Sequence, residues 1–348
     1  MEIGTQELDD ASRIVDFPNP PEELNLLTAT PEQLVFYGIP PRPDPDTEVE
    51  LYRAWLQFFE PRPTFVSEEI KTTLDEFRVQ TRESAPSAIN VSSATRYETS
   101  RNWCGAYIAA NDYKVFVQVS GEWTVPEPSP PPKAKPGEYT CSAWVGLDGQ
   151  RRYFNSSLPQ IGTWQKVTLL TDGTKQFETF AWFQWWAKDY ENNRPYRINS
   201  VPIVIGDKVG CIVRVWERSV AYVAILNFST RRFFRKKIRA PIVRMRRPEI
   251  SGATAEWIME RPAILKTPDQ LYSLADYGQL EFSSCYAAEA SPAEPNWPHV
   301  VGTGLKLDGE RLIRMYDVLP NPNRTQFISM AQKTSETSAV ASYGGFHV

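Results

Sequence analysis

The chain has 348 residues, of which 41% are hydrophobic and 23% are charged, and its formal net charge is -4. This length allows one large domain or two modest ones, and the composition excludes a wholly disordered chain. With only two histidines and four widely spaced cysteines, the sequence also argues against a Ser-His-Asp triad, a three-histidine metal site and a zinc ribbon.

Charge is distributed unevenly along the chain. Residues 1–95 contain 7 basic and 18 acidic side chains, whereas residues 96–348 contain 31 basic and 24 acidic ones. This asymmetry indicates an acidic arm, or two parts of one chain whose attraction would weaken as carboxylates are protonated in acid. No secretion signal and no apolar stretch of about 18 residues is visible, so we expect a soluble protein that does not enter a membrane and is cytoplasmic by default, with secretion left open as an alternative.

The acidic region is expected to be extended to about residue 30 and helical afterwards. Thr30-Pro31-Glu32-Gln33 predicts a helix start, with Thr30 as the N-cap and Pro31 at the first helical position. A second helix is predicted from Asp46 to Phe59, where apolar residues recur at helical spacing, and a third over 67–81. Residues 83–95 are rich in Ser, Ala and Asn and are expected to form a linker.

After about residue 102 the hydrophobic pattern changes to an alternation with a period of two, which is typical of strands. Strands are predicted at 114–125, 139–147, 166–170, 176–186, 209–217, 220–228, 232–239, 254–260, 279–284, 304–307, 311–316 and 325–330. Many short strands joined by tight turns, without helices between them, predict an all-β antiparallel sandwich or barrel. We therefore divide the chain into an N-terminal region, 1–95, and a β-domain, 96–348.

Two polar residues stand out because each lies within apolar strand sequence. Glu256 is in Ala255-Glu256-Trp257-Ile258, where burial would raise its pKa and suit it to general acid-base chemistry. Gln160 is in Leu158-Pro159-Gln160-Ile161, where its amide could orient a water molecule or stabilise an oxyanion. The alternative is that both are ordinary polar residues on strand faces. Cys104 has no evident histidine partner and is expected to be a core residue.

The β-domain resembles the eqolisin-type glutamic peptidases in a series of short motifs that follow the family order. They are Asn102-Trp103-x-Gly105-Ala106-Tyr107, Val119-Ser120-Gly121-Glu122-Trp123-Thr124-Val125-Pro126, Ser142-Ala143-Trp144-Val145-Gly146-Leu147-Asp148-Gly149, Gln160-Ile161-Gly162, Ala181-Trp182-Phe183-Gln184-Trp185, Asn227-Phe228-Ser229-Thr230, Ala255-Glu256-Trp257-Ile258 and Ala275-Asp276-Tyr277-Gly278. The match covers residues 102–285 and leaves the N-terminal region unexplained.

The resemblance implies a sandwich of two antiparallel sheets, similar in architecture to concanavalin A-like lectins and glucanases, with the active site on a concave face. It implies an acid-acting endopeptidase that takes polypeptide substrates and needs no cofactor or metal. The family's catalytic pair falls on Gln160 and Glu256, and positions near its cleft fall on Trp144, Asp148 and Trp182. Gln184 is assigned to the substrate-binding residues as well, although many relatives carry an acidic residue there. Pro159 before Gln160 is a second departure from the family pattern.

Three alternatives remain open from the sequence. The first is a non-catalytic, lectin-like sandwich that binds carbohydrate or peptide, and the second is a glycoside hydrolase that pairs Glu256 with Asp148. The third concerns the segment 231–247, which has nine basic residues in seventeen. This segment could bind nucleic acid, form a solvated strand face, or dock the acidic N-terminal region. We expect a monomer without nucleic acid, in which the N-terminal region packs on the sandwich or inhibits it.

Overall fold

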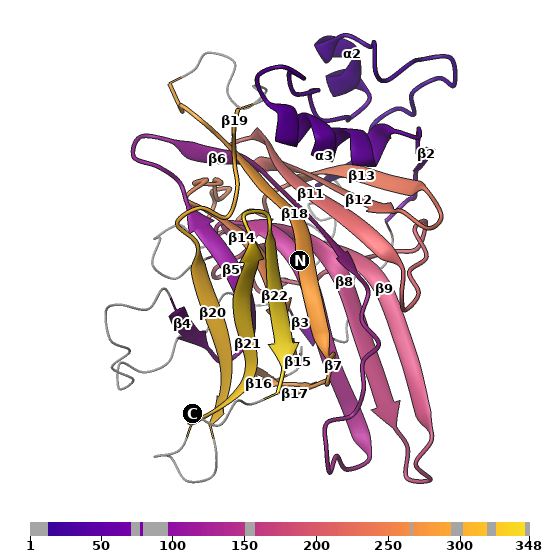
Figure 1. The fold of residues 1–348 in the computed structure, drawn as a ribbon, viewed down its shortest axis with the longest axis vertical. Coiled ribbons are helices and arrows are strands. Elements are labelled where there is room, and N and C mark those ends of the chain that lie inside the picture. Colours follow the sequence, from indigo (N-terminus) through magenta and orange to yellow (C-terminus); the bar gives the residue numbers. More distant parts are fainter. Residues whose placement is uncertain are drawn as a thin grey trace.

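The computed structural model describes residues 13–70, 77–78, 97–149, 157–264, 267–293, 302–318 and 325–344. Two β-sheets face each other, and two short helices lie across strands of one sheet (Figure 1). The all-β sandwich predicted from the sequence is confirmed. None of the described helices is long and apolar enough to cross a membrane. The predicted linker at 83–95 and both histidines, His299 and His347, lie outside the described residues.

The first sheet, sheet A, is antiparallel except where β2 joins its edge. Its hydrogen-bonded order runs from β13 through β12, β11, β6 and β18 to β19, and β1 and β2 pair with the free edge of β13. The bounds are β1 (Ile14–Val15), β2 (Thr64–Val66), β6 (Val115–Thr124), β11 (Lys208–Glu217), β12 (Val220–Asn227), β13 (Arg232–Arg239), β18 (Gln279–Ala290) and β19 (Thr303–Leu305).

The second sheet, sheet B, runs in the order β10, β9, β8, β7, β14, β5, β20, β21, β22, and then meets the first half of β18. Strand β18 therefore belongs to both sheets. The bounds are β4 (Tyr97–Ser100), β5 (Trp103–Ala109), β7 (Gly137–Leu147), β8 (Ser157–Leu169), β9 (Lys175–Ala187), β10 (Tyr196–Ile198), β14 (Thr254–Glu260), β17 (Ser273–Leu274), β20 (Arg311–Val318), β21 (Thr325–Ser335) and β22 (Ser338–Tyr343). A small third sheet joins β3 (Phe77–Arg78), β15 (Ala263–Ile264) and β16 (Thr267–Leu271).

The main hydrophobic core lies between the two sheets. Sheet A contributes side chains such as Val213, Val223 and Phe234, and sheet B contributes Ile161 and Trp257. Cys104 belongs to this core, where burial raises the pKa of its thiol to about 12, and all four cysteines are buried free thiols. The expectation that Cys104 is a packing residue rather than a nucleophile is confirmed.

The N-terminal region contains α2 (Pro31–Phe36) and α3 (Val49–Phe59). The predicted capping box at Thr30 is confirmed, because Thr30 Oγ1 accepts from the backbone of Gln33 and the Gln33 side chain accepts from the backbone of Thr30. The second helix begins at Val49, after Glu48, rather than at Asp46. The predicted third helix is wrong for residues 67–70, which have no regular structure, and for 77–78, which form β3.

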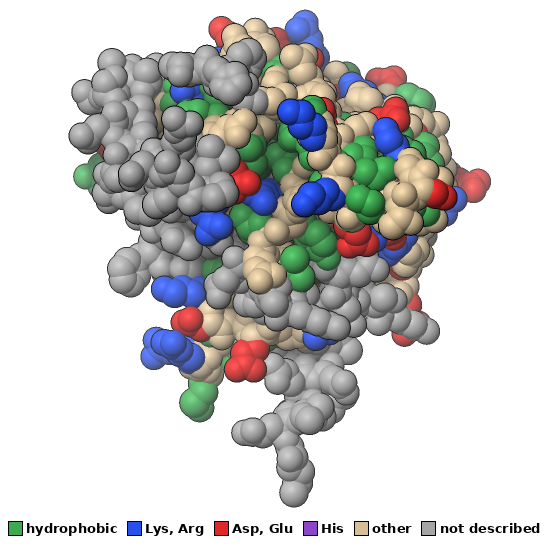
Figure 2. Space-filling view, turned by 90° about the horizontal axis from the view of Figure 1, so that it is seen from below, with side chains coloured by type: hydrophobic (Ala, Val, Ile, Leu, Met, Phe, Trp, Pro, Cys, Tyr) green, Lys and Arg blue, Asp and Glu red, His purple; other side chains and the backbone are tan. Residues whose placement is uncertain are grey.

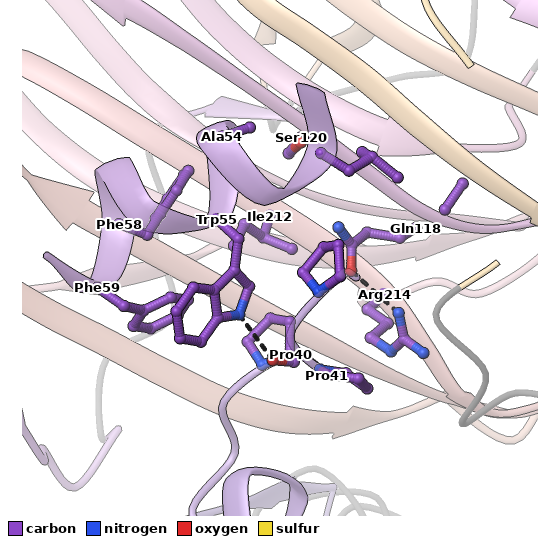
Figure 3. A pocket seen from close by; sticks show the side chains of 13 residues that line it. Pro40, Pro41, Ala54, Trp55, Phe58, Phe59, Gln118, Ser120, Ile212 and Arg214 are labelled. Carbon is purple, nitrogen blue, oxygen red and sulfur yellow. Dashed lines mark hydrogen bonds between the residues drawn. The ribbon is translucent and has the colours of Figure 1, made fainter. Parts of the chain in front are cut away.

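Residues 17–59 cover the outer face of sheet A. Trp55, Phe58 and Phe59 of α3 form one apolar cluster with Ile212, Tyr222, Ala224, Leu226 and Phe233 of sheet A. The indole N–H of Trp55 donates to the carbonyl of Pro40 at 2.9 Å, and Figure 3 shows Pro40 and Pro41 lining the same pocket as Gln118 and Arg214. Strand β12 is consequently buried at all eight positions, because the core covers one of its faces and residues 17–59 cover the other.

The basic strand β13 makes polar contacts with the same N-terminal region. Arg235 and Lys236 are each only 2% exposed, so the expectation of a solvated face is wrong for these two residues. Arg235 donates to the backbone carbonyls of Tyr37 and Pro18, and Lys236 donates to Asp16. Backbone carbonyls do not titrate, so most of these contacts persist in acid, unlike the carboxylate attraction suggested by the charge asymmetry.

At the end of the molecule opposite the helices, described Lys and Arg side chains are interspersed with Asp and Glu (Figure 2).

We predict that a chain starting at residue 67 will be poorly soluble or strongly destabilised. Removing the preceding residues uncovers Ile212, Tyr222, Leu226 and Phe233, and an apolar sheet face exposed to water promotes aggregation. The measurement is the soluble yield together with the thermal midpoint, compared with a chain starting at residue 13. A truncated chain that is soluble with an unchanged midpoint would contradict this role for residues 13–66.

Candidate functional site

The two polar residues singled out in the sequence lie on the same face of sheet B, two strands apart. In the register of the sheet, Gln160 of β8 is opposite Gly146 of β7, and Gly146 is opposite Glu256 of β14. Adjacent strands are spaced by about 4.8 Å, which puts the backbones of Gln160 and Glu256 about 10 Å apart. Both side chains are fully buried. The register therefore brings the predicted pair together across one intervening residue.

That intervening residue is a glycine, so residue 146 places no side chain of its own between them, but Leu158 and Trp144 lie close to that position. A Cβ atom at Gly146 would lie 2.8 Å from Leu158 Cδ1 and 3.0 Å from the Trp144 ring. An alanine would therefore require its neighbours to shift. Gly146 was not recognised as functional in the sequence, because its position between Gln160 and Glu256 depends on strand register.

Each of the two side chains has an oxygen without a partner. One carboxylate oxygen of Glu256, Oε1, accepts from the Thr254 hydroxyl at 2.6 Å, whereas Oε2 has no hydrogen-bond partner among the described residues. Gln160 Nε2 lies 3.3 Å from Gln184 Oε1, and Gln160 Oε1 likewise has no such partner. Buried polar atoms are nearly always hydrogen-bonded, so the unpaired acceptors of the residues on either side of Gly146 are candidates for binding a water molecule or a polar substrate group.

Burial is the main influence on the charge state of Glu256. Desolvation raises the pKa of the Glu256 carboxyl well above its usual value, the nearby carboxylate of Asp148 raises it further, and the hydrogen bond from Thr254 lowers it. Thr254 lies two residues before Glu256 on the same strand face, so the period of the strand could have indicated it. A carboxyl group with a raised pKa can both accept and donate a proton in weak acid.

Asp148 lies just beyond the end of β7 and supports the start of β14. Its carboxylate accepts from the backbone N–H and the hydroxyl of Ser251, each at 2.7 Å, and from the backbone N–H of Ala253 at 2.9 Å. Asp148 itself has a left-handed backbone, with φ of 69°. Desolvation raises the pKa of Asp148 to about 6, although these hydrogen bonds act in the opposite direction. Asp148 thus fixes the segment that leads into Glu256.

The two predicted tryptophans occupy the row next to the Gln160–Glu256 row on the same face. Trp182 and Trp144 flank Gly162, and both indoles are fully buried. The Trp144 N–H donates to Glu260 at 2.7 Å, and the Trp182 N–H donates to the Ser142 hydroxyl at 3.0 Å. These bonds fix both rings beside the polar row. Among the described residues, no group of three His, Cys, Asp or Glu side chains could hold a metal ion.

Comparison with known proteins gives consistent results. A model of the Peptidase A4 family matches residues 101–303. Aspergillopepsin-2 from Aspergillus niger is 25% identical over 214 residues, which cover 57% of this chain and 68% of that protein. The solved structure of scytalido-glutamic peptidase with a transition state analog inhibitor has a TM-score of 0.50 at 20% identity, and the match covers 70% of this chain and 98% of that one. SCP-B, a member of the Eqolisin family solved with the tripeptide Ala-Ile-His, has a TM-score of 0.48 at 21% identity over the same shares.

We predict that the protein becomes more stable as the pH falls from 7 to about 4.5. The folded pKa values of Asp148 and Glu256 lie above their unfolded values, so the native state binds more protons than the unfolded state in this interval. The unfolding free energy then increases as protons are added. Thermal midpoints measured across this range should rise for the parent chain and rise less for Asp148→Asn and Glu256→Gln. A flat or falling midpoint in the parent chain would contradict the raised pKa values.

Proposed function

The chain belongs to the Peptidase A4 family and hydrolyses peptide bonds, and we propose that Gln160 and Glu256 are the catalytic pair of an acid-acting glutamic endopeptidase. The observation that supports this pairing most strongly is the Gln160–Gly146–Glu256 row, with one unpaired acceptor on each side of the glycine. The same pair was identified in the sequence both by its apolar context and by its motifs.

In the proposed mechanism a water molecule lies between Gln160 and Glu256, in a gap over Gly146 that Leu158 and Trp144 border. It donates one hydrogen bond to Glu256 Oε2 and a second to Gln160 Oε1, the two acceptors without partners. The ionised form of Glu256, which is the minority form in acid because burial raises the pKa of this carboxyl, takes a proton from the water, whose oxygen attacks the carbonyl carbon of the scissile peptide bond. No covalent bond to the enzyme forms, so a single tetrahedral intermediate is expected.

The intermediate carries a negative oxygen, which is proposed to accept a hydrogen bond from the amide of Gln160. Preorganised donors of this kind are worth most in a site that excludes water, and both residues are fully buried here. Glu256, now protonated, gives its proton to the amide nitrogen as the carbon–nitrogen bond breaks. The products are a carboxylic acid and an amine, and Glu256 returns to its ionised form.

The surrounding residues are assigned supporting roles in the same proposal. Trp144 and Trp182 would line the substrate side of the pair, since they occupy the row beside it, and because both are fully buried a substrate would reach them only by displacing the side chains that cover them. Asp148 would hold residues 251–253 and raise the pKa of Glu256. Its carboxylate accepts three hydrogen bonds, which disfavours the role of nucleophile that a glycoside hydrolase would need.

The N-terminal region is proposed to be a stabilising part of the folded enzyme. Its apolar contacts are with the outer face of sheet A, whereas Gln160 and Glu256 lie on sheet B. This placement favours a stabilising role over inhibition by direct cover of the catalytic pair.

The test is casein hydrolysis between pH 2 and 7 by the parent chain, Gln160→Ala and Glu256→Gln. Loss of an oxyanion donor typically lowers kcat by about 100- to 1,000-fold, and loss of the only general base should cost at least as much. Gln165→Met is a matched control, because Gln165 is also buried in β8 but contacts Cys141, a residue of the main core. Parent-like cleavage by either Gln160→Ala or Glu256→Gln would refute the catalytic assignment.

A further inference from the structure

Gln184 lies beside the catalytic pair and contacts one of its members directly. It is opposite Gln160 in the antiparallel register of β8 and β9, which makes the two residues cross-strand neighbours on one face. Gln184 is 1% exposed, and its Oε1 lies 3.3 Å from Gln160 Nε2. The row on sheet B therefore contains four residues, Gln184, Gln160, Gly146 and Glu256.

This contact bears on which end of the Gln160 amide faces Glu256. Gln184 lies on one side of Gln160, and Gly146 with Glu256 lies on the other. When one Nε2 hydrogen of Gln160 is donated to Gln184, the second hydrogen and Oε1 remain for the gap over Gly146. If the amide were turned by half a rotation, Nε2 would point toward the gap and Oε1 toward Gln184. The water would then lose the acceptor that the mechanism requires.

We propose that Gln184 is a positioning residue for Gln160: its amide oxygen accepts one N–H of Gln160 and so keeps Oε1 directed at the water. This inference rests on the proposed function and replaces direct substrate binding as the role of Gln184. Because the Gln184 side chain is a neutral amide, its acceptor is present at every pH at which the protein is folded. The orientation of Gln160 then does not depend on the titration of residue 184.

A positioning role and a substrate-binding role for Gln184 predict different changes in kcat and KM. A misplaced Gln160 would destabilise the transition state while leaving the apolar row of Trp144 and Trp182 intact. A positioning role therefore predicts a lower kcat with a nearly unchanged KM, whereas a substrate-binding role predicts a higher KM with an unchanged kcat. A role in folding alone predicts a lower thermal midpoint with both constants unchanged in the folded protein.

The experiment measures kcat and KM for a peptide substrate with Gln184→Met and Gln184→Glu in the full chain. Methionine has similar length but no strong acceptor, so kcat should fall about 10- to 100-fold and KM should stay within about twofold. Glutamate offers an acceptor oxygen whether or not it is protonated, so Gln184→Glu should recover most of the lost kcat. Gln165→Met is again the matched control, and its kcat should be that of the parent chain.

The outcomes distinguish this inference from the proposed function. If Glu256→Gln is inactive and Gln184→Met has the parent kcat, the positioning role fails and the catalytic pair stands. A raised KM with an unchanged kcat in Gln184→Met would also overturn the positioning role, in favour of a substrate subsite. If Glu256→Gln retains parent activity, the proposed function itself fails, whatever the Gln184 variants do. Should Gln184→Met fail to fold, Gln184→Leu and Gln184→Glu supply the same comparison.

Discussion

The register of three neighbouring strands determines how the proposed site can work. Strands β8, β7 and β14 align so that Gln160, Gly146 and Glu256 form one row across sheet B. A shift of one residue in either pairing would turn one side chain to the opposite face and separate the pair. The glycine in the middle is equally necessary, because a Cβ atom there would press against Leu158, Trp144 and the Cβ of Gln160. The chemistry therefore depends on backbone pairing as much as on the two side chains.

Burial connects this row to the rest of the molecule. The core between the sheets holds the inner face of sheet B in place, and Asp148 fixes the segment before β14 through three hydrogen bonds. On sheet A, residues 17–59 cover the outer face, so β12 is buried on both sides. Because both faces of β12 are packed, exposing either of them to water would destabilise the fold. The N-terminal region is thus joined to the sandwich mainly by apolar packing and by arginine bonds to backbone carbonyls, rather than by a simple attraction between acidic and basic parts.

The strand pattern, the first helix and the catalytic candidates were accessible from the sequence because each depends on local order. Thr30 and Gln33 form their capping box within four residues, and the alternation in 209–217 reflects one strand in its own sheet. The third helix failed because residues 67–70 pack irregularly against the sandwich, where Glu68 accepts hydrogen bonds from the backbones of Asn199 and Ser200, a tertiary effect that helix propensity does not include. Gly146 and the contact between Gln184 and Gln160 could not be placed, since they depend on the register between different strands, whereas Thr254 follows from the period of the strand that carries Glu256. Likewise, the burial of Arg235 and Lys236 depends on residues about 200 positions earlier.

The central claim is that Gln160 and Glu256 act together on one water molecule. The most direct test is a double-mutant cycle of kcat/KM with Gln160→Ala, Glu256→Gln and the double variant, at the pH of highest parent activity. If both residues act on the same water, the double variant should have about the same kcat/KM as the less active single variant. The first change already abolishes the action of the pair on the water, so the second change has little left to remove. A double variant whose loss equals the product of the two single losses would contradict a shared water and would show that the two residues act independently.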